Sequence, residues 1–294
     1  MKKNKKSYLV TGGAGFIGTN LIKRFLKDDH EVFCFDNYST GLKENEQHGC
    51  QYFNINLAKV KEYDFLESKP DVIFHLAALA RIEPSFEFPT KTFEDNVNST
   101  LNILDYARKH NIKVVYAGSS SYHGGVYKNP YTYTKWQGEE LCKLFSKIYN
   151  LNTTICRFYN VYGPFQITDG PYSAIVGIFQ RQFLDKSPLT VTGDGEQRRD
   201  FTHVDDIVEG LVKSSEYESN GNIFELGTGK NYSINELAEM FGKEYPVTYL
   251  PKREGEMRDT LCDISGAKEK IHYNPSRDLE KYIKEWIKES ISKT

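Results

Sequence analysis

The feature that most constrains the fold is an alternation of short, apolar, β-branched runs with longer stretches of helical periodicity, from residue 7 to about residue 160. Such alternation is typical of βαβ units that build a parallel sheet. Right-handed crossovers would place the intervening helices on both faces of that sheet. We expect strands at SYLVT, EVFCF, DVIFHL, KVVYAG and TTICRF, and helices at about 15–27, 90–109 and 131–149.

Three glycines stand between the first expected strand and the first expected helix, in the segment VTGGAGFIG. Gly12 and Gly15 would let the backbone turn tightly and approach a pyrophosphate, and Gly18 would let the helix pack close against the strand. The phosphates would then lie at the positive end of the helix, beside Phe16 and Ile17. The spacing predicts a dinucleotide site.

A carboxylate follows at the end of the second expected strand, where Asp36 lies 18 residues after Gly18 and directly before Asn37. A carboxylate there can accept hydrogen bonds from both hydroxyls of an adenosine ribose, and it would repel a 2′-phosphate. No arginine follows it directly. The sequence therefore predicts NAD rather than NADP as the cofactor.

The pattern changes after residue 164, where turns surround an apolar helix expected near 172–184. Strand–helix rhythm returns in FTHVDDIVEGLVKSS and NIFELGTG, and helices are expected near 233–242 and 276–291. The predicted fold class is α/β, a Rossmann-type doubly wound parallel sheet with a smaller α/β substrate-binding lobe. We expect an NAD-binding domain over 1–165, rejoined by 200–230, and a lobe built from 166–199 and 231–294.

Composition narrows the classes of partner. With 38 basic and 40 acidic residues the net charge is -2, which predicts neither nucleic acid nor an anionic membrane surface as a partner. No apolar stretch reaches the roughly 18 residues that span a bilayer. The five cysteines are odd in number and lack metal-type or CxxC spacing, so no metal site is expected and a reducing cytoplasm is the expected compartment.

A candidate catalytic group begins the helix expected at 131–149, where Tyr131 and Lys135 are four residues apart and share one face. A nearby ammonium favours the phenolate, which would make the tyrosine a proton acceptor. The preceding strand ends in AGSSS, so a hydroxyl from Ser119 or Ser120 could bridge the substrate and the phenol. Tyr133 competes with Tyr131, but it has no lysine four residues on.

These motifs, with HLAA at residues 75–78 between them, resemble in order those of the extended short-chain dehydrogenase/reductase family of sugar-nucleotide epimerases and dehydratases. The resemblance favours Ser119 as the catalytic hydroxyl, leaves Ser120 as a rival, and implies that Lys135 also binds the nicotinamide ribose. Asn56 stands where relatives commonly have an aspartate that contacts adenine. Further cofactor contacts are expected from Asn56, Leu57, Ala77, Ala78 and Asn96.

Three later segments resemble the substrate-binding parts of that family. RFYNVYGP implies that Asn160 contacts the substrate's diphosphate side, while GDGEQRRDF and REGE imply that Arg199 and Arg253 bind the diphosphate. Guanidinium forks suit phosphate oxygens. Thr260 stands where a bulky aromatic closes the pocket of some 4-epimerases, so room for an N-acetylated hexose is expected.

The loop after the serine motif separates reaction types. Resembling dehydratases usually carry Asp-Glu beside the catalytic hydroxyl, and related decarboxylases keep a glutamate there, but this chain has Ser120 and Ser121. The resemblance therefore implies NAD-dependent 4-epimerisation of a UDP-hexose (glucose/galactose or their N-acetyl forms) through a transient 4-keto sugar. The alternatives are epimerisation or reduction of another nucleotide sugar, such as UDP-glucuronate or a GDP- or CDP-deoxyhexose, and a non-catalytic NAD-binding module.

Two further expectations concern the surroundings of the site. The connection from Ser119 to Tyr131 is shorter than in many sugar-nucleotide epimerases, so the sugar pocket is expected to be more open or differently covered. The helices expected at 90–109 and 131–149 resemble the pair that forms a four-helix interface in relatives, which predicts a homodimer.

Overall fold

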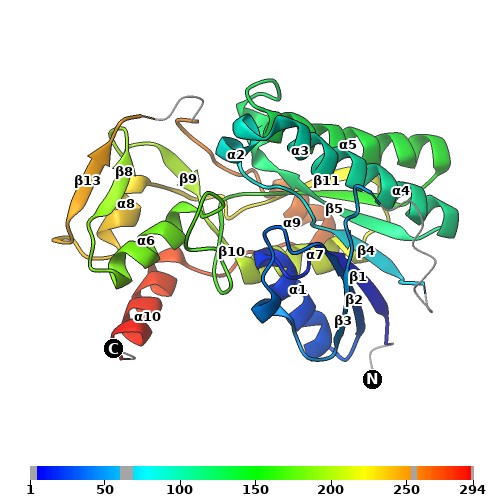
Figure 1. The fold of residues 1–294 in the computed structure, drawn as a ribbon, viewed down its shortest axis with the longest axis horizontal. Coiled ribbons are helices and arrows are strands. Elements are labelled where there is room, and N and C mark those ends of the chain that lie inside the picture. The colour runs from blue at the N-terminus through cyan, green and yellow to red at the C-terminus, as the bar shows by residue number, and fades with distance from the viewer. Residues whose placement is uncertain (1–4, 60–68, 253–256, 293–294) are drawn as a thin grey trace.

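The computed structural model describes residues 5–59, 69–252 and 257–292. Its main sheet contains the strands β1 (Ser7–Thr11), β2 (Glu31–Asp36), β3 (Cys50–Asn54), β4 (Val72–His75), β5 (Lys113–Ser119), β6 (Thr153–Phe158) and β11 (Asn220–Leu226). They are arranged in the order β11-β6-β5-β4-β1-β2-β3, and every neighbouring pair is parallel (Figure 1). The predicted fold class is confirmed, and the order reverses between β1 and β4.

One strand escaped the sequence analysis. β3 lies at the edge of the sheet and is paired only with β2. Its five residues, CQYFN, are all partly or fully exposed, so they do not form the apolar run that marks a central strand. All strands that were predicted for the N-terminal half are present.

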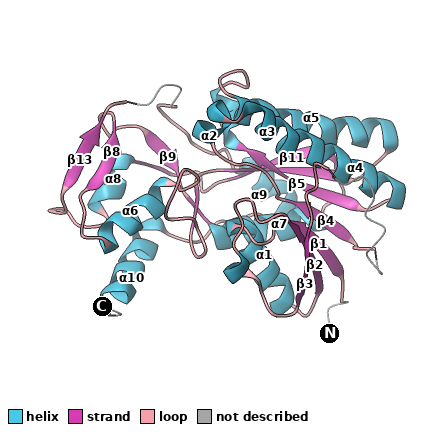
Figure 2. Cartoon of the chain, in the orientation of Figure 1, coloured by secondary structure: helices cyan, strands magenta, loops and turns pink. Residues whose placement is uncertain are grey.

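Helices cover both faces of the sheet (Figure 2). One face packs against α1 (Phe16–Lys27), α7 (Val204–Glu216) and α9 (Ser265–Ile271), and the other packs against α4 (Ser99–His110) and α5 (Pro130–Tyr149). Successive residues of β1 alternate between the two cores, with Leu9 on the α5 side and Val10 on the α1 side. This alternation buries both faces and is typical of a parallel sheet.

The helix predicted at 90–109 is divided. It consists of α3 (Pro89–Phe93), a π-helical turn η2 (Glu94–Asn98) and then α4. The hydroxyls of Ser99 and Thr100 donate to the carbonyls four residues earlier, which competes with regular helical hydrogen bonding. The helical periodicity predicted the extent of this segment but not the wider turn inside it.

A second region has its own core, formed mainly by α6 (Ile175–Leu184), α8 (Ile234–Glu239) and α10 (Leu279–Ser292). Phe179, Leu237 and Phe241 lie at its centre, fully or almost fully buried. Ala267 and Ile271 of α9 instead pack on the main sheet, so the division of the chain into two regions stays a prediction. The remaining elements are α2 (Ile82–Glu87), η1 (Lys43–Asn45), η3 (Ser120–Gly124) and the paired strands β7 (Val161–Tyr162) with β10 (Thr202–His203), β8 (Leu189–Thr192) with β13 (Val247–Leu250), and β9 (Arg198–Asp200) with β12 (Asn231–Ser233).

Candidate functional site

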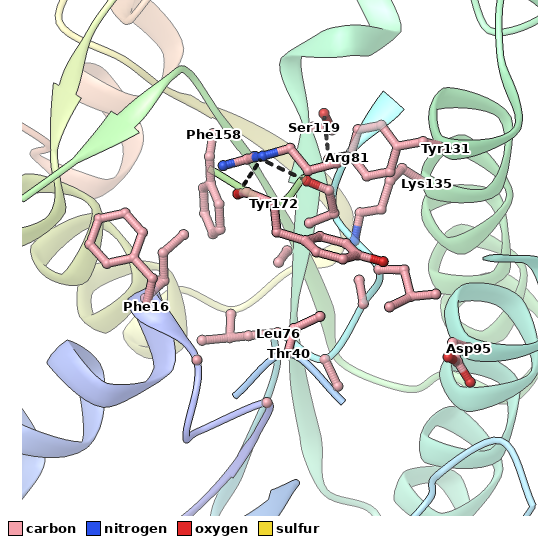
Figure 3. A pocket seen from close by; sticks show the side chains of 18 of the residues that line it. Phe16, Thr40, Leu76, Arg81, Asp95, Ser119, Tyr131, Lys135, Phe158 and Tyr172 are labelled. Atoms are coloured by element: carbon pink, nitrogen blue, oxygen red, sulfur yellow. Dashed lines mark hydrogen bonds between the residues drawn. The ribbon is translucent and has the colours of Figure 1, made fainter. Parts of the chain in front are cut away.

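A cavity of about 580 Å³ opens at the carboxyl ends of β1, β2, β4 and β5. The strand order of the sheet reverses between β1 and β4, and ligands of open parallel sheets bind at such a reversal. Figure 3 shows side chains from the main sheet and from the second region around one space. The predicted site residues that line it are Gly12, Gly15, Phe16, Ile17, Gly18, Asp36, Asn37, Asn56, Leu57, Ala77, Ala78, Ser119, Tyr131, Lys135, Asn160, Arg199 and Thr260.

The glycine segment forms a tight turn from β1 into α1. Gly12 has φ +69°, and a Cβ atom there would lie 2.9 Å from the backbone of Ala77. At Gly18 a Cβ atom would lie 2.3 Å from the carbonyl oxygen of Gly12. Neither position has room for a side chain, so glycine is needed for the turn to pack against Ala77 and for α1 to pack against the turn.

Asp36 ends β2 and is held by backbone amides. Its two carboxylate oxygens accept hydrogen bonds from the amides of Ala14 at 2.9 Å and Tyr38 at 2.8 Å. Burial raises the pKa of Asp36, and these hydrogen bonds oppose the rise. Each carboxylate oxygen can accept a further bond, so the ribose role predicted for Asp36 fits its geometry.

The structure does not bring Asn96 into the cavity, contrary to the cofactor contact expected for it. Its side chain is buried, accepts from the amide of Leu79 at 2.8 Å and donates to Thr134 Oγ1 at 3.0 Å. The amide group therefore joins the loop after β4 to helix α5. Asn56 does line the cavity, and its side-chain oxygen accepts from the amide of Ala58.

The predicted catalytic residues come together at the ends of β5 and α5. Asn129 caps α5 by accepting a hydrogen bond from the amide of Thr132, which places Tyr131 in the first turn. Tyr131 Oη donates to Ser119 Oγ at 3.2 Å. Ser119 Oγ also lies 2.9 Å from Ser121 Oγ. Because Ser119 makes the hydrogen bond with the tyrosine, the geometry favours Ser119 over Ser120 as its partner.

Lys135 lies one turn further along α5 and is only 5% exposed. Its ammonium stands 4.3 Å from the ring centroid of Tyr116. Burial lowers the pKa of Lys135 to about 8, although the charge of Glu139 opposes this. The ammonium is therefore poorly solvated.

The pKa of Tyr131 is raised above its ordinary value, whereas the sequence analysis expected it to be lowered. Burial raises it, and the hydrogen bond with Ser119 and the positive charge of Arg81 offset this only in part. The cation whose charge lowers the pKa of Tyr131 is thus Arg81, whereas the sequence pointed to Lys135. Arg81 lines the cavity just before α2 and was not singled out by the sequence analysis.

A second group of charged side chains packs against Gly118 of β5, with Arg157 at its centre. Its guanidinium makes ion pairs with Glu139 at 2.6 Å and Glu225 at 3.0 Å, and it stacks 3.7 Å from the ring centroid of Tyr122. His123 bonds to the same carboxylate of Glu225 at 3.1 Å. The short loop after Ser119 is therefore tied to the sheet.

The predicted substrate residues meet on the opposite wall. Asn160 Nδ2 donates to the carbonyl of Asp200 at 3.0 Å, and the amide of Thr260 donates to the carbonyl of Arg198 at 3.1 Å. Arg199 lies on the strand between these contacts, β9. Arg253, the second predicted arginine, lies outside the described residues.

The short loop has a partner in this wall. A Cβ atom at Gly124 would lie 2.7 Å from Met257 Sδ, so the loop packs directly on a residue that lines the cavity. This contact joins the loop after β5 to the chain just after the second predicted arginine segment. The sequence analysis expected a more open or differently covered sugar pocket, and it did not identify Met257 as a contact of this loop.

The fold and this site define a nucleotide-binding enzyme of the extended short-chain dehydrogenase/reductase type. The glycine turn, the buried carboxylate after β2 and the Ser119–Tyr131–Lys135 group fit a dinucleotide with its redox end at the tyrosine. The sequence matches the NAD dependent epimerase/dehydratase family over residues 8–227, and the chain belongs to that family. NAD is its cofactor.

Similar proteins in this family act on several nucleotide sugars. The chain is 31% identical to a UDP-N-acetyl-alpha-D-glucosaminuronate decarboxylase of Bacillus cytotoxicus, over 96% of this chain and 97% of the relative. It is 30% identical to the structure of UDP-N-acetylglucosamine 4-epimerase from Methanobrevibacter ruminantium, with TM-score 0.91 over 99% and 100% of the two chains. The structure of UDP-glucuronic acid 4-epimerase from Bacillus cereus, with UDP-glucuronic acid and NAD, is 27% identical with TM-score 0.86 over 96% and 99%.

One finding bears on membrane association. Among the helices of the described residues, none combines the length and the apolar character that crossing a membrane requires.

Proposed function

We propose that the chain catalyses NAD-dependent 4-epimerisation of a UDP-hexose, glucose/galactose or their N-acetyl forms, through a transient 4-keto sugar. The observation that carries this proposal is the hydrogen bond between Tyr131 and Ser119, at the carboxyl edge of the sheet and one helical turn from buried Lys135. A binding module would have no need of this arrangement, since it resembles a proton-transfer group.

In this mechanism Ser119 and Tyr131 hold the 4-hydroxyl of the sugar. Bound NAD supplies the hydride acceptor and donor at C4. Tyr131 takes the hydroxyl proton during oxidation and returns it after the keto sugar has rotated to present its other face. Such a proton transfer contributes about 10²- to 10⁴-fold to the rate in typical enzymes. Burial disfavours the phenolate of Tyr131, and the hydrogen bond with Ser119 and the positive charge of Arg81 partly offset this.

Two neighbouring residues oppose elimination and decarboxylation. Ser120 and Ser121 line the cavity at the positions where resembling dehydratases and decarboxylases carry acidic residues. Neither hydroxyl is a useful acid or base near neutral pH, because serine side chains do not titrate there. Return of the hydride to the same carbon is the outcome that these residues leave.

The substrate is proposed to lie across the cavity from Tyr131 to Arg199. Asn160, Arg199 and Arg253 would bind the diphosphate, and the small side chain of Thr260 would leave room for an N-acetyl group. The alternative sugar is UDP-glucuronate, which the cavity residue Arg81 favours.

The test is to incubate the purified protein with UDP-glucose, UDP-N-acetylglucosamine and UDP-glucuronate separately and to follow each anomeric proton by NMR. Appearance of a 4-epimer supports the proposal and identifies the sugar. If none of the three converts even with NAD added, 4-epimerisation of these UDP-sugars is wrong.

We also infer a homodimer in the cytoplasm. Large apolar side chains are exposed on α4 and α5, among them Leu101 at 42%, Leu144 at 49% and Ile148 at 60%. These helices contact each other and could form a four-helix interface with a second copy. All five cysteines are free thiols, as is typical of a reducing compartment. Light scattering should give a dimer mass, and Ile148→Glu should give a monomer.

A further inference from the structure

We propose that Arg81 forms a subsite for a carboxylate on the sugar, so that the chain prefers a UDP-hexuronate such as UDP-glucuronate over a neutral UDP-hexose. This inference rests on the proposed 4-epimerisation, and it replaces the neutral hexose of that proposal by the alternative sugar, which carries a carboxylate at C6. It begins from the position of one arginine that sequence motifs do not mark.

Arg81 is held in place by neutral groups only. Its Nε donates to the carbonyl of Tyr172 at 2.8 Å, and its Nη1 donates to the carbonyl of Ala80 at 3.0 Å. A guanidinium has five N–H donors, so these two bonds orient the group and leave donors for a ligand. Figure 3 shows Arg81 on the side of the cavity that carries Ser119 and Tyr131.

The charge of Arg81 has no carboxylate partner within ion-pair distance among residues 5–59, 69–252 and 257–292. Burial lowers its pKa, and the charge of Tyr131 opposes this. Arg157, by contrast, has two carboxylate partners. A half-buried cation that lines a cavity without an ion-pair partner can bind an anionic group of a ligand.

Two anionic groups of a nucleotide sugar could reach this arginine, the diphosphate and a carboxylate at C6. The position of Arg81 favours the carboxylate. It lies on the side of the cavity that carries Ser119 and Tyr131, where the 4-hydroxyl is proposed to lie, and C6 is attached to the carbon next to C4 (Figure 3). The diphosphate is proposed to lie at Asn160 and Arg199 instead, at the other wall.

The neighbouring hydroxyls fit the same ligand. Ser120 and Ser121 line the cavity beside Ser119. Their hydroxyl groups can donate hydrogen bonds to a carboxylate and carry no negative charge that would repel it. An acidic residue at either position would repel a carboxylate substrate. Arg81 and the two serines therefore form a site that a C6 carboxylate satisfies better than a C6 hydroxymethyl group does.

The test compares UDP-glucuronate with UDP-glucose, which differ only at C6, and uses UDP alone to report on the diphosphate. Titration calorimetry on the NAD-loaded protein gives the three dissociation constants, and NMR gives the initial rates of epimerisation. We expect wild type to bind UDP-glucuronate at least about 30-fold more tightly than UDP-glucose, as is usual for a buried charge pair.

Three variants locate the effect. Arg81→Gln should weaken binding of UDP-glucuronate by about 30-fold and change binding of UDP-glucose and UDP by less than about threefold. Arg81→Lys should recover part of the loss, because it restores the charge but not the fork. Arg277→Gln, at an exposed ion pair with Asp205, is the matched control and should leave all three constants unchanged.

The outcomes separate this proposal from the proposed function. Equal binding of the two sugars by wild type overturns the carboxylate subsite without requiring any variant to fold. Parallel weakening of UDP and both sugars in Arg81→Gln assigns Arg81 to the diphosphate and also overturns it. Selective binding of UDP-glucuronate without epimerisation of either sugar supports the subsite while contradicting the proposed reaction.

Discussion

Two clusters of partly or fully buried charged side chains lie near the carboxyl end of β5, and they differ in how far the protein itself satisfies their charges. In the cavity cluster, formed by Arg81, Tyr131 and Lys135, burial lowers the pKa of both cations. In the rear cluster, formed by Arg157, Glu139 and Glu225, burial also lowers the pKa of the arginine, but the hydrogen bonds and charges of Glu139 and Glu225 together more than offset this. A charge that the protein satisfies itself serves the fold, whereas a poorly satisfied charge in a cavity is a candidate for function.

The largest expected effect tests whether the cavity cluster performs chemistry. Tyr131→Phe removes the hydroxyl that donates to Ser119. We expect kcat for 4-epimerisation to fall about 10³-fold, because proton transfer is lost, with binding of UDP unchanged. The control is Tyr133→Phe, two positions along α5, which should keep nearly full activity. A collapse of activity in the control alone would make Tyr133 the base and contradict the assignment.

The rear cluster should instead affect stability. Glu139→Ala leaves Arg157 buried with one carboxylate fewer, so we expect the free energy of unfolding to fall by roughly 3 kcal/mol. Urea denaturation followed by circular dichroism measures this. Glu140→Ala removes an exposed partner of Lys143 and should cost less than about 0.5 kcal/mol. Similar losses in the two variants would show that the buried pair contributes nothing special.

The pH dependence of stability distinguishes the clusters further. The folded pKa of Lys135 is about 8, below the unfolded value of about 10.4. The unfolded chain therefore binds more protons between these values, and stability must rise with pH in that window. Relative to Lys135→Met, wild type should gain about 2 kcal/mol between pH 7 and pH 10.

Urea unfolding of both proteins at several pH values, without added nucleotide, gives this difference. Other titrating groups cancel in the subtraction, since the two chains differ at one position. Lys143→Met, at the exposed pair with Glu140, provides the flat reference. If the difference in stability between wild type and Lys135→Met also stayed constant with pH, the ammonium would be solvated. The cavity cluster would then carry no unsatisfied charge.

The sequence predicted the parts of the site that lie within one element or one turn. Gly12, Gly18, Tyr131 and Lys135 are related by spacing along the chain, and spacing determines which residues share a turn or a helix face. Arg81 could not be found in this way, because its contact with Tyr172 joins residues 91 positions apart. Periodicity identifies elements, but it does not report which distant side chain completes a cavity or leaves a charge without a partner.

The smallest expected effect concerns Asp36, a buried charge of a third kind, since backbone amides rather than a cation satisfy it. Asp36→Asn keeps the size of the side chain but replaces charged acceptors by a weaker one, so we expect NAD affinity to fall about tenfold. Affinity for NADP should fall less or rise, because repulsion of the 2′-phosphate is removed. Calorimetry with both cofactors measures this, with exposed Asp29→Asn as the control. Unchanged NAD affinity would mean that Asp36 serves the turn through Ala14 and Tyr38 alone, and the carboxylate would then belong with the rear cluster as a structural charge.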